Sequence, residues 1–339
     1  MTARAPAALF VAALFTIAGC GHHRGAQPGQ LTLGMVTDVG GLGDRSFNDS
    51  AYRGLLRSKR KLGAYVQVLQ SRSAADYQPN LIALANLHFQ MIYAIGFLMA
   101  QDLDQIAKEN PQQHFAIIDA VVDDPNIVSV TFREQDGSFL AGALAAMMSP
   151  THHIAFLGGQ DIPLLRKFEA GYIAGAREID PTITVDVKYI GSFDDVAAGQ
   201  ELANLLFDSG ADIVYTAAGK AGLGAIDAVK SRKGDYVIGV DSNQDALAPG
   251  KILTSMVKRV DVAVFDVARA LQRGKPLTGH LVLGLKNGAI GLTDFAYTRN
   301  IIGAQRIARL ARIKAAIIRG AIHPPDTRAA LAAFKPVAL

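Results

Sequence analysis

The chain has 339 residues, half of them apolar, which is enough to bury one or two ordinary hydrophobic cores. Its formal net charge is +4 and its basic residues are spread along the sequence, which argues against a nucleic-acid partner. A single cysteine excludes an internal disulfide framework, so the position of that cysteine carries more information than the count.

This cysteine, Cys20, closes an N-terminal segment that resembles a bacterial lipoprotein signal peptide. Arg4 precedes an apolar stretch at residues 7–17, and an Ile-Ala-Gly-Cys box ends at Cys20. The apolar stretch is shorter than the roughly 20 residues of a membrane-spanning helix, so a retained transmembrane helix is the weaker alternative. The resemblance implies a signal peptide at residues 1–19, cleavage before a lipidated Cys20, and a flexible tether through residue 30.

After the tether, short apolar runs alternate with segments of helical periodicity, the pattern typical of repeated βα units and parallel sheets. A first series of strands is predicted at residues 31–36, 64–69, 91–95, 115–118 and 127–131. A helix predicted at residues 139–148 leads into a second series of strands at residues 154–157, 184–190, 213–216, 237–240 and 252–257. The four-residue spacing of Gly171 and Gly175 predicts close packing of the intervening helix against a neighbour.

Two similar α/β series joined by several chain crossings predict two lobes with a ligand held in the cleft between them. A further helix at 262–272 and strand at 280–284 are too few elements for a third domain, so we assign them to the first lobe. A basic amphipathic helix is predicted at 301–320, with its cations forming a solvated face. The resulting boundaries are residues 31–133 plus 259–285 for the N-terminal lobe and 134–258 plus 286–339 for the C-terminal lobe.

The strongest candidate for a ligand-binding segment is the loop from Asp38 to Asn48, between the first predicted strand and helix. Three glycines allow the backbone to turn tightly and approach a ligand, and a Ser/Asn/Asp cluster supplies a helix cap and spare polar groups. Phe47 lies at the helix entrance, beyond the carboxyl end of a strand, where open α/β sheets bind small molecules. The alternative is a hydrophobic staple that packs Phe47 onto its own helix.

These motifs, with others in the same order and spacing, resemble the basic membrane protein family of ABC-transporter substrate-binding lipoproteins, which includes purine nucleoside receptors. The resemblance covers nearly the whole chain after the tether, and its motifs include residues 38–48, 115–119, 137–146, 191–195 and 238–244. It implies a type I periplasmic-binding fold with two doubly wound parallel-sheet lobes and a hinge. It also implies a lipid-anchored protein on the extracytoplasmic side of the cell membrane that delivers nucleosides to the permease and ATPase subunits of an importer. We expect a monomer without a cofactor or a metal.

A purine nucleoside offers two flat faces, a hydrogen-bonding base edge and vicinal sugar hydroxyls. A base would be sandwiched between Phe47 and Phe193, one from each lobe. By resemblance, Asp119 reads the base edge with help from Asn48, and Asp241 binds the ribose. The remaining positions of the predicted pocket are Asp38, Gly219 and Lys258.

Alternatives remain at single residues and for the whole protein. Phe193 could instead be a core residue, and each aspartate could instead cap the helix that follows it. Such a residue would not belong to the binding site. Lys220 stands where the family usually has a small residue, which leaves the sugar-side specificity open. The scattered histidines and acids favour no catalytic arrangement, and a gene regulator of this fold would need an N-terminal helix-turn-helix. A transporter for a pyrimidine nucleoside, a sugar or another ligand, and a surface-exposed adhesin, stay possible.

Overall fold

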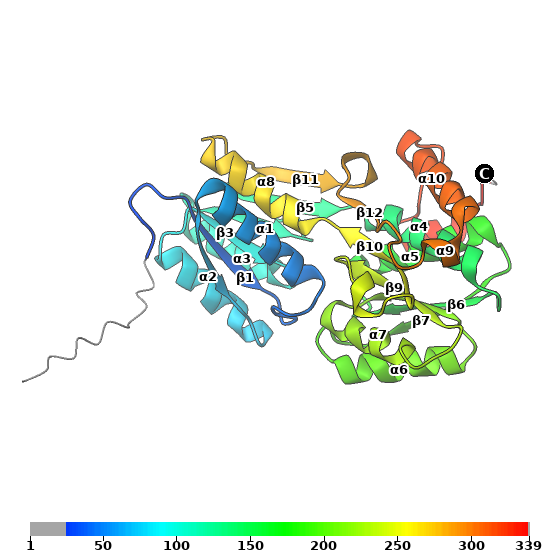
Figure 1. Cartoon of the computed structure of the whole chain (residues 1–339). Coiled ribbons are helices and arrows are strands. Elements are labelled where there is room, and N and C mark those ends of the chain that lie inside the picture. The colour runs from blue at the N-terminus through cyan, green and yellow to red at the C-terminus, as the bar shows by residue number, and fades with distance from the viewer. Residues whose placement is uncertain (1–24, 338–339) are drawn as a thin grey trace, which may run out of the picture.

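The computed structural model describes residues 25–337, so the predicted signal peptide and the lipidation site at Cys20 lie outside the described residues. Two α/β lobes lie next to each other, and each is built on one six-stranded sheet (Figure 1). Within residues 25–337, no helix is long and apolar enough to cross a membrane.

The sheet of the first lobe has the order β11-β5-β4-β3-β1-β2, and every neighbouring pair is parallel. Its strands are β1 (Thr32–Thr37), β2 (Tyr65–Leu69), β3 (Met91–Ile95), β4 (His114–Ile118), β5 (Ile127–Phe132) and β11 (Gly279–Leu283). Apolar side chains at helical spacing pack two pairs of helices onto opposite faces of this sheet. One pair is α1 (Phe47–Leu62) with α8 (Val260–Gln272), and the other is α2 (Tyr77–Asn86) with α3 (Ala100–Glu109).

The sheet of the second lobe has the order β12-β10-β9-β8-β6-β7. Its strands are β6 (His153–Gly158), β7 (Thr184–Tyr189), β8 (Ile213–Ala217), β9 (Tyr236–Asp241), β10 (Ile252–Lys258) and β12 (Ile290–Leu292). Strand β12 pairs antiparallel with β10, whereas the other pairs are parallel. We did not predict β12, because three residues are too few to show a period.

The helices of the second lobe depart from two sequence predictions. They are α4 (Glu134–Met148), α5 (Pro163–Ile179), α6 (Val196–Asp208), α7 (Leu223–Val229), α9 (Arg299–Ile302), α10 (Ala304–Arg319) and α11 (Arg328–Ala333). The predicted start of α4 at Phe139 is wrong, because the polar first turn from Glu134 is helical and fully buried. The predicted basic helix at 301–320 is confirmed as α10, but it begins at Ala304, because Gly303, at a φ of 82°, separates it from the short α9.

The close approach predicted from Gly171 and Gly175 is confirmed. Helix α5 packs against α4, and a Cβ at either glycine would collide with the α4 backbone at Gln135 or Phe139. This contact fixes the position of the buried first turn of α4, which reaches the boundary between the lobes.

The chain passes between the lobes three times, after β5, after β10 and after β11. The crossing segments are hydrogen-bonded to one another: Arg133 N donates to Leu283 O at 2.8 Å, and Arg259 N donates to Ala289 O at 2.8 Å. Three short, mutually bonded crossings form the type of connection about which two lobes rotate in hinged binding proteins.

Candidate functional site

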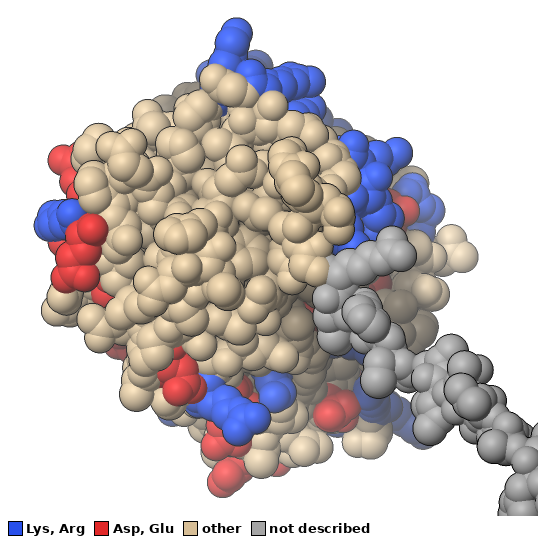
Figure 2. Space-filling model, turned by 90° about the vertical axis from the view of Figure 1, so that its left-hand side faces the viewer, with Lys and Arg blue, Asp and Glu red and all other residues tan. Residues whose placement is uncertain are grey.

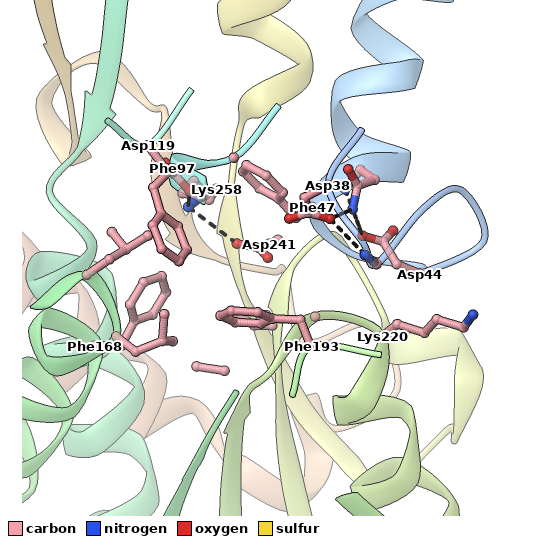
Figure 3. Close-up of a pocket in the computed structure, with 18 residues that line it drawn as sticks. Asp38, Asp44, Phe47, Phe97, Asp119, Phe168, Phe193, Lys220, Asp241 and Lys258 are labelled. Carbon is pink, nitrogen blue, oxygen red and sulfur yellow. Dashed lines mark hydrogen bonds and ion pairs between the residues drawn. The ribbon is translucent and has the colours of Figure 1, made fainter. Parts of the chain in front are cut away.

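A cavity of about 550 Å³, including its opening to solvent, lies between the two lobes (Figure 3). A volume of this size falls within the range of small-molecule sites. All eight ligand-binding residues predicted from the sequence line it: Asp38, Phe47, Asn48, Asp119, Phe193, Gly219, Asp241 and Lys258. Lys220 also lines the cavity, with its ammonium group directed away from the cavity centre in Figure 3.

The polar residues of the cavity come from the carboxyl ends of strands in both sheets. Asp38 and Asp119 directly follow β1 and β4, while Asp241 and Lys258 are the last residues of β9 and β10. Asp119 and Asp241 both have left-handed backbones, with φ of 71° and 61°. This conformation costs about 1–2 kcal/mol for a residue with a side chain, so the surrounding structure imposes it at two matching strand ends.

The loop between β1 and α1 is held by two carboxylates. Asp38 Oδ1 accepts hydrogen bonds from Gly40 N at 2.9 Å and Asn48 Nδ2 at 2.7 Å. Asp44 accepts from the backbone N–H groups of Asn48 at 2.7 Å and Asp49 at 3.0 Å, and thereby caps α1. Burial raises the pKa of Asp38 to about 7. Asp44 lines the cavity too, although the sequence analysis had not assigned it to the site.

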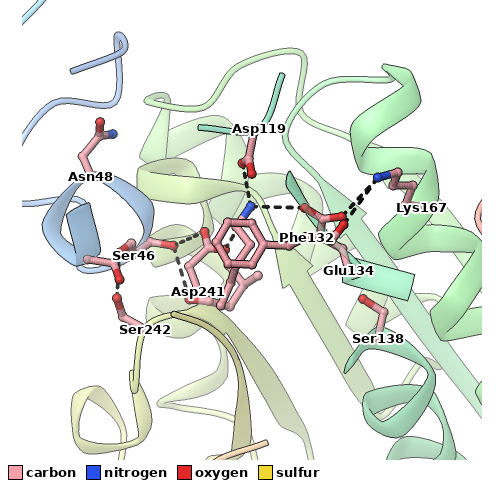
Figure 4. A network of polar contacts seen from close by, with 12 residues as sticks. Ser46, Asn48, Asp119, Phe132, Glu134, Ser138, Lys167, Asp241 and Ser242 are labelled. Atoms are coloured by element: carbon pink, nitrogen blue, oxygen red, sulfur yellow. Dashed lines mark hydrogen bonds and ion pairs between the residues drawn. The ribbon is translucent and has the colours of Figure 1, made fainter. Parts of the chain in front are cut away.

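A buried ion cluster surrounds Lys258, whose side chain is only 2% exposed (Figure 4). Its Nζ donates to Asp119 Oδ2 at 2.6 Å and lies 3.6 Å from Glu134 Oε1 and 3.9 Å from Asp241 Oδ1. Burial by itself would lower the pKa of Lys258, but the three carboxylates raise it above its ordinary value, so the side chain is an ammonium. Its Nζ also lies 4.9 Å from the centre of the Phe47 ring, which adds a cation–π contact.

Hydrogen bonds across the cleft join α1 to the end of β9. Ser46 Oγ donates to Asp241 Oδ2 at 2.9 Å, and Ser242 Oγ donates to Ser46 O at 2.6 Å. Arg53 Nη2 donates to Ser242 Oγ at 2.8 Å. Burial raises the pKa of Asp241 to about 6, with Lys258 opposing the rise. The two lobes are therefore in contact beside the cavity.

Aromatic rings from both lobes face the cavity. Phe47, at the start of α1, and Phe193, in the loop between β7 and α6, approach it from opposite sides in Figure 3. The Phe193 ring lies so close to Gly159 that a Cβ there would collide with it. Phe97 and Phe168 also line the cavity, and the Phe97 ring meets the Phe193 ring edge-on at 6.3 Å between centroids.

Sequence reasoning missed Phe97, Phe168 and Glu134. Phe97 could have been found, because it follows the end of β3 just as Asp38 follows the end of β1. Phe168 and Glu134 lie on helices, where nothing in the local sequence distinguishes them from ordinary helix residues. Only the arrangement of α4 and α5 between the lobes brings them to the site.

Several buried oxygens at the cavity have no hydrogen-bond partner among the described residues. They are Asn48 Oδ1, Asp119 Oδ1 and Asp241 Oδ1. Buried polar atoms are almost always hydrogen-bonded in native proteins, and these three are acceptors, so the cavity suits a ligand with several N–H or O–H donors. Within residues 25–337, no group of three His, Cys, Asp or Glu side chains is arranged to hold a metal.

Comparisons with known proteins agree with this geometry. Residues 31–328 match the model of a family described as ABC transporter substrate-binding protein PnrA-like. The chain is 35% identical to the "ABC transporter nucleoside-binding protein BmpA" of Lactococcus lactis, with 95% of this chain and 98% of the relative covered. It is 37% identical to "Basic membrane protein A1" of Borrelia garinii, with 76% of this chain and 78% of the relative covered.

Solved structures show the same architecture. An ABC transporter solute-binding protein from Aeropyrum pernix superposes with a TM-score of 0.83 at 28% identity, covering 89% of this chain and 96% of that one. A second, from Conexibacter woesei, gives a TM-score of 0.68 at 20% identity, covers 87% of this chain and 99% of that one, and supports the fold alone. The two parallel-sheet α/β lobes thus form a type I periplasmic-binding fold, as predicted. The chain belongs to the PnrA-like family of ABC transporter substrate-binding proteins, whose members bind solutes and are not enzymes.

Proposed function

We propose that this protein binds a purine nucleoside between its lobes and delivers it to the permease and ATPase of an ABC importer. The observation that carries the proposal is the pair of phenylalanine rings, Phe47 and Phe193, that face one cavity from different lobes. Unpartnered acceptors beside these rings add the hydrogen-bonding groups that a nucleoside needs. The Lactococcus lactis relative is named a nucleoside-binding protein, which supports the same ligand class.

The base would stack between the two rings and present its edge to the first lobe. Stacking on an aromatic side chain contributes about 1–3 kcal/mol per base. The Asp119 carboxylate accepts hydrogen bonds. Asn48 also offers an acceptor, because its Nδ2 donates to Asp38 and Asp44 while its Oδ1 has no partner among the described residues. This pair favours a base with N–H groups on its edge, so inosine and guanosine should bind at least as well as adenosine.

The ribose would bind on the Asp241 side. Asp241 Oδ1 is buried and unpartnered, and vicinal hydroxyls can donate to it. A hydrogen bond to a charged group contributes about 1.5–3 kcal/mol. Asp241 belongs to the second lobe, whereas the base of the same ligand would contact the first lobe. Because the ligand contacts both lobes, it favours the closed form over the open form.

We further propose that the mature protein is a monomer anchored by lipid on Cys20 to the extracytoplasmic side of the cell membrane, with residues 20–30 as its tether. The pairing of β11 with β5 and the packing of α8 on α1 also support the proposed assignment of α8 and β11 to the N-terminal lobe. A Cys20→Ser variant should leave the membrane fraction. If that variant stays with membranes in high salt, the lipid-anchor proposal is wrong.

Isothermal titration calorimetry on ligand-stripped protein tests the nucleoside proposal. Inosine, guanosine or adenosine should bind with a dissociation constant below about 100 μM, equivalent to a binding free energy of about −5.5 kcal/mol. Cytidine, uridine and free ribose serve as comparison ligands. Tighter binding of a pyrimidine nucleoside or a sugar than of every purine nucleoside would contradict the proposed ligand class.

A further inference from the structure

Five exposed cations gather at one end of the first lobe. They belong to the last turn of α1 and to the segment after α8, and we call them the basic end: Lys59, Arg60, Lys61, Arg273 and Lys275. Gln272 Nε2 donates to Leu62 O at 3.0 Å and ties the two helix ends together. The five cations therefore lie near one another on two joined helix ends.

These cations have no ion-pair partner within residues 25–337. None of the five side chains forms an ion pair with a described residue, whereas Arg269, one turn earlier on α8, pairs with Asp266 at 2.8 Å. Favourable interaction with the helix dipole accounts for cations on the last turn of α1. The same interaction accounts for Arg273 at the C-cap of α8, but it does not account for Lys275 or for the placement of the two helix ends side by side.

The basic end lies on the side of the lobe away from the cavity. Helices α1 and α8 run back from the carboxyl ends of the strands, where the cavity is, so their last turns lie near the amino ends. In Figure 2, Lys and Arg gather along the upper and upper right edge of this face, and the centre of the face is uncharged. The groove beside β3 and β4 is lined by neutral groups that include Asn86, Gln90 and Gln113.

The described chain begins beside the basic end. Gln30 Nε2 donates to Gly63 O at 2.7 Å, and Gly63 directly follows the last turn of α1. Cys20 precedes Gly25 by five positions, and an extended chain spans at most about 3.6 Å per residue, so Cys20 lies within about 18 Å of Gly25. A lipid at Cys20 thus brings a bilayer within reach of the basic end.

We propose that the basic end docks on an anionic phospholipid surface and sets the orientation of the protein on the membrane. The proposal rests on the lipid anchor proposed above. One lipid anchor leaves the lobe free to rotate, and each Lys or Arg near an anionic surface strengthens contact about fivefold. Docking by this end holds the cavity on the side of the first lobe that faces away from the bilayer.

The second basic surface of the protein supplies a matched control. This set lies in the other lobe, with Arg309, Arg312, Lys314 and Arg319 on α10 and Lys335 after α11, and carries the same total charge. In Figure 1, α10 lies at the opposite end of the molecule from the start of the described chain. The two sets of cations therefore have equal charge but differ in their distance from the proposed tether.

Energy transfer on the full lipoprotein tests the proposal. A Thr278→Cys substitution next to the basic end provides one thiol for attaching the donor dye. The labelling is specific because Cys20 is the only other cysteine and its thiol is proposed to carry lipid. The protein is reconstituted into vesicles of phosphatidylcholine, with or without phosphatidylglycerol, that carry acceptor dye on lipid headgroups. Transfer should increase at least about twofold with the anionic lipid and return to the neutral level at about 1 M salt, where the Debye length is about 3 Å.

Glutamine at all five positions of the basic end should abolish the increase, and glutamine at the five control positions should leave it unchanged. Equal loss in both variants, or no difference between the two lipids, would overturn docking by this end while leaving the anchor intact. Increased energy transfer in native membranes, but not in anionic vesicles that contain no other protein, would overturn the lipid partner in favour of a membrane protein. Failure of the lipoprotein to associate with any vesicle would overturn the anchor and the docking proposal together.

Discussion

The two lobes place an aspartate at the same point of the same sheet topology, but they give it different partners. Strands β4 and β9 are each third in their sheet order, and each is followed or ended by a left-handed aspartate, Asp119 or Asp241. Asp119 accepts from Lys258 at 2.6 Å, whereas Asp241 is 3.9 Å from the same ammonium and accepts from Ser46. Topology therefore fixes where a carboxylate can lie, and the neighbouring side chains fix which groups it binds.

The first loops of the two lobes differ in polarity. The loop between β1 and α1, together with the first turn of α1, gives the cavity Asp38, Asp44 and Asn48. The first two turns of α5 give it Leu164 and Phe168. The strand-to-helix region thus adds polar groups beside Phe47 in the first lobe and apolar groups in the second. In the proposed function, this division lets the first lobe select the base edge while the second lobe excludes water from the base.

The largest effect should come from removing the cation that the two aspartates share. Lys258→Met would leave Asp119, Glu134 and Asp241 buried without their neutralising partner. Breaking a buried ion pair from one side costs about 3–5 kcal/mol, so urea denaturation should show a loss of unfolding free energy of this size. Lys167→Met is the control, because Lys167 is more exposed and 3.4 Å from Glu134, and its effect should be smaller. A Lys258→Met protein as stable as the parent would show that the cluster contributes little.

Much of the site could be predicted because parallel strands bring their carboxyl ends to one edge. Asp38, Asp119 and Asp241 were selected from the sequence on that ground and on family resemblance, and all three line the cavity. Glu134 could not be selected in this way. Its role depends on the packing of α4 against α5 at the lobe boundary, and the polar first turn of α4 shows no apolar period.

Substituting the two aspartates separately should distinguish their roles. Asp241→Asn should weaken binding of every purine nucleoside about tenfold to a hundredfold, because it removes the charge that strengthens hydrogen bonds to ribose. Asp119→Asn should instead change the preference between bases, since an amide can donate to the adenine ring nitrogen. Calorimetry with guanosine and adenosine measures both effects. An unchanged guanosine-to-adenosine affinity ratio in Asp119→Asn would contradict the assignment of the base edge to Asp119.

Removing one stacking face should have a somewhat smaller effect. Phe193→Ala should weaken nucleoside binding about tenfold, within the range of about 1–3 kcal/mol for stacking on an aromatic. Phe97→Ala is the comparison, because Phe97 lines the same cavity but meets the Phe193 ring edge-on at 6.3 Å, so its loss should weaken binding less. Unfolding free energy should change little in Phe193→Ala, because the side chain is partly exposed. Equal loss of affinity in the two variants would indicate that Phe193 acts through packing and not through a direct face.

The smallest effect, and the one that depends most directly on the unequal aspartates, is that of pH. Without ligand, burial raises the pKa of Asp241 from 3.8 to about 6, with nearby Asp119 adding to the rise, so the folded protein binds more protons than the unfolded chain between these values. This group therefore contributes stability that is fully present below pH 3.8 and is lost as the pH rises through about 6.

Ligand should reverse that trend. Ribose hydroxyls donate to the carboxylate and stabilise its charged form, so binding should release a proton and weaken about fourfold between about pH 7.5 and about pH 5.5. Calorimetry in buffers of different ionisation enthalpy measures the proton released. Asp241→Asn should remove the dependence, whereas Asp38→Asn serves to separate the contribution of Asp38, whose pKa is raised to about 7. Proton uptake on binding, or a pH dependence that survives in Asp241→Asn, would place the titrating group elsewhere in the cavity.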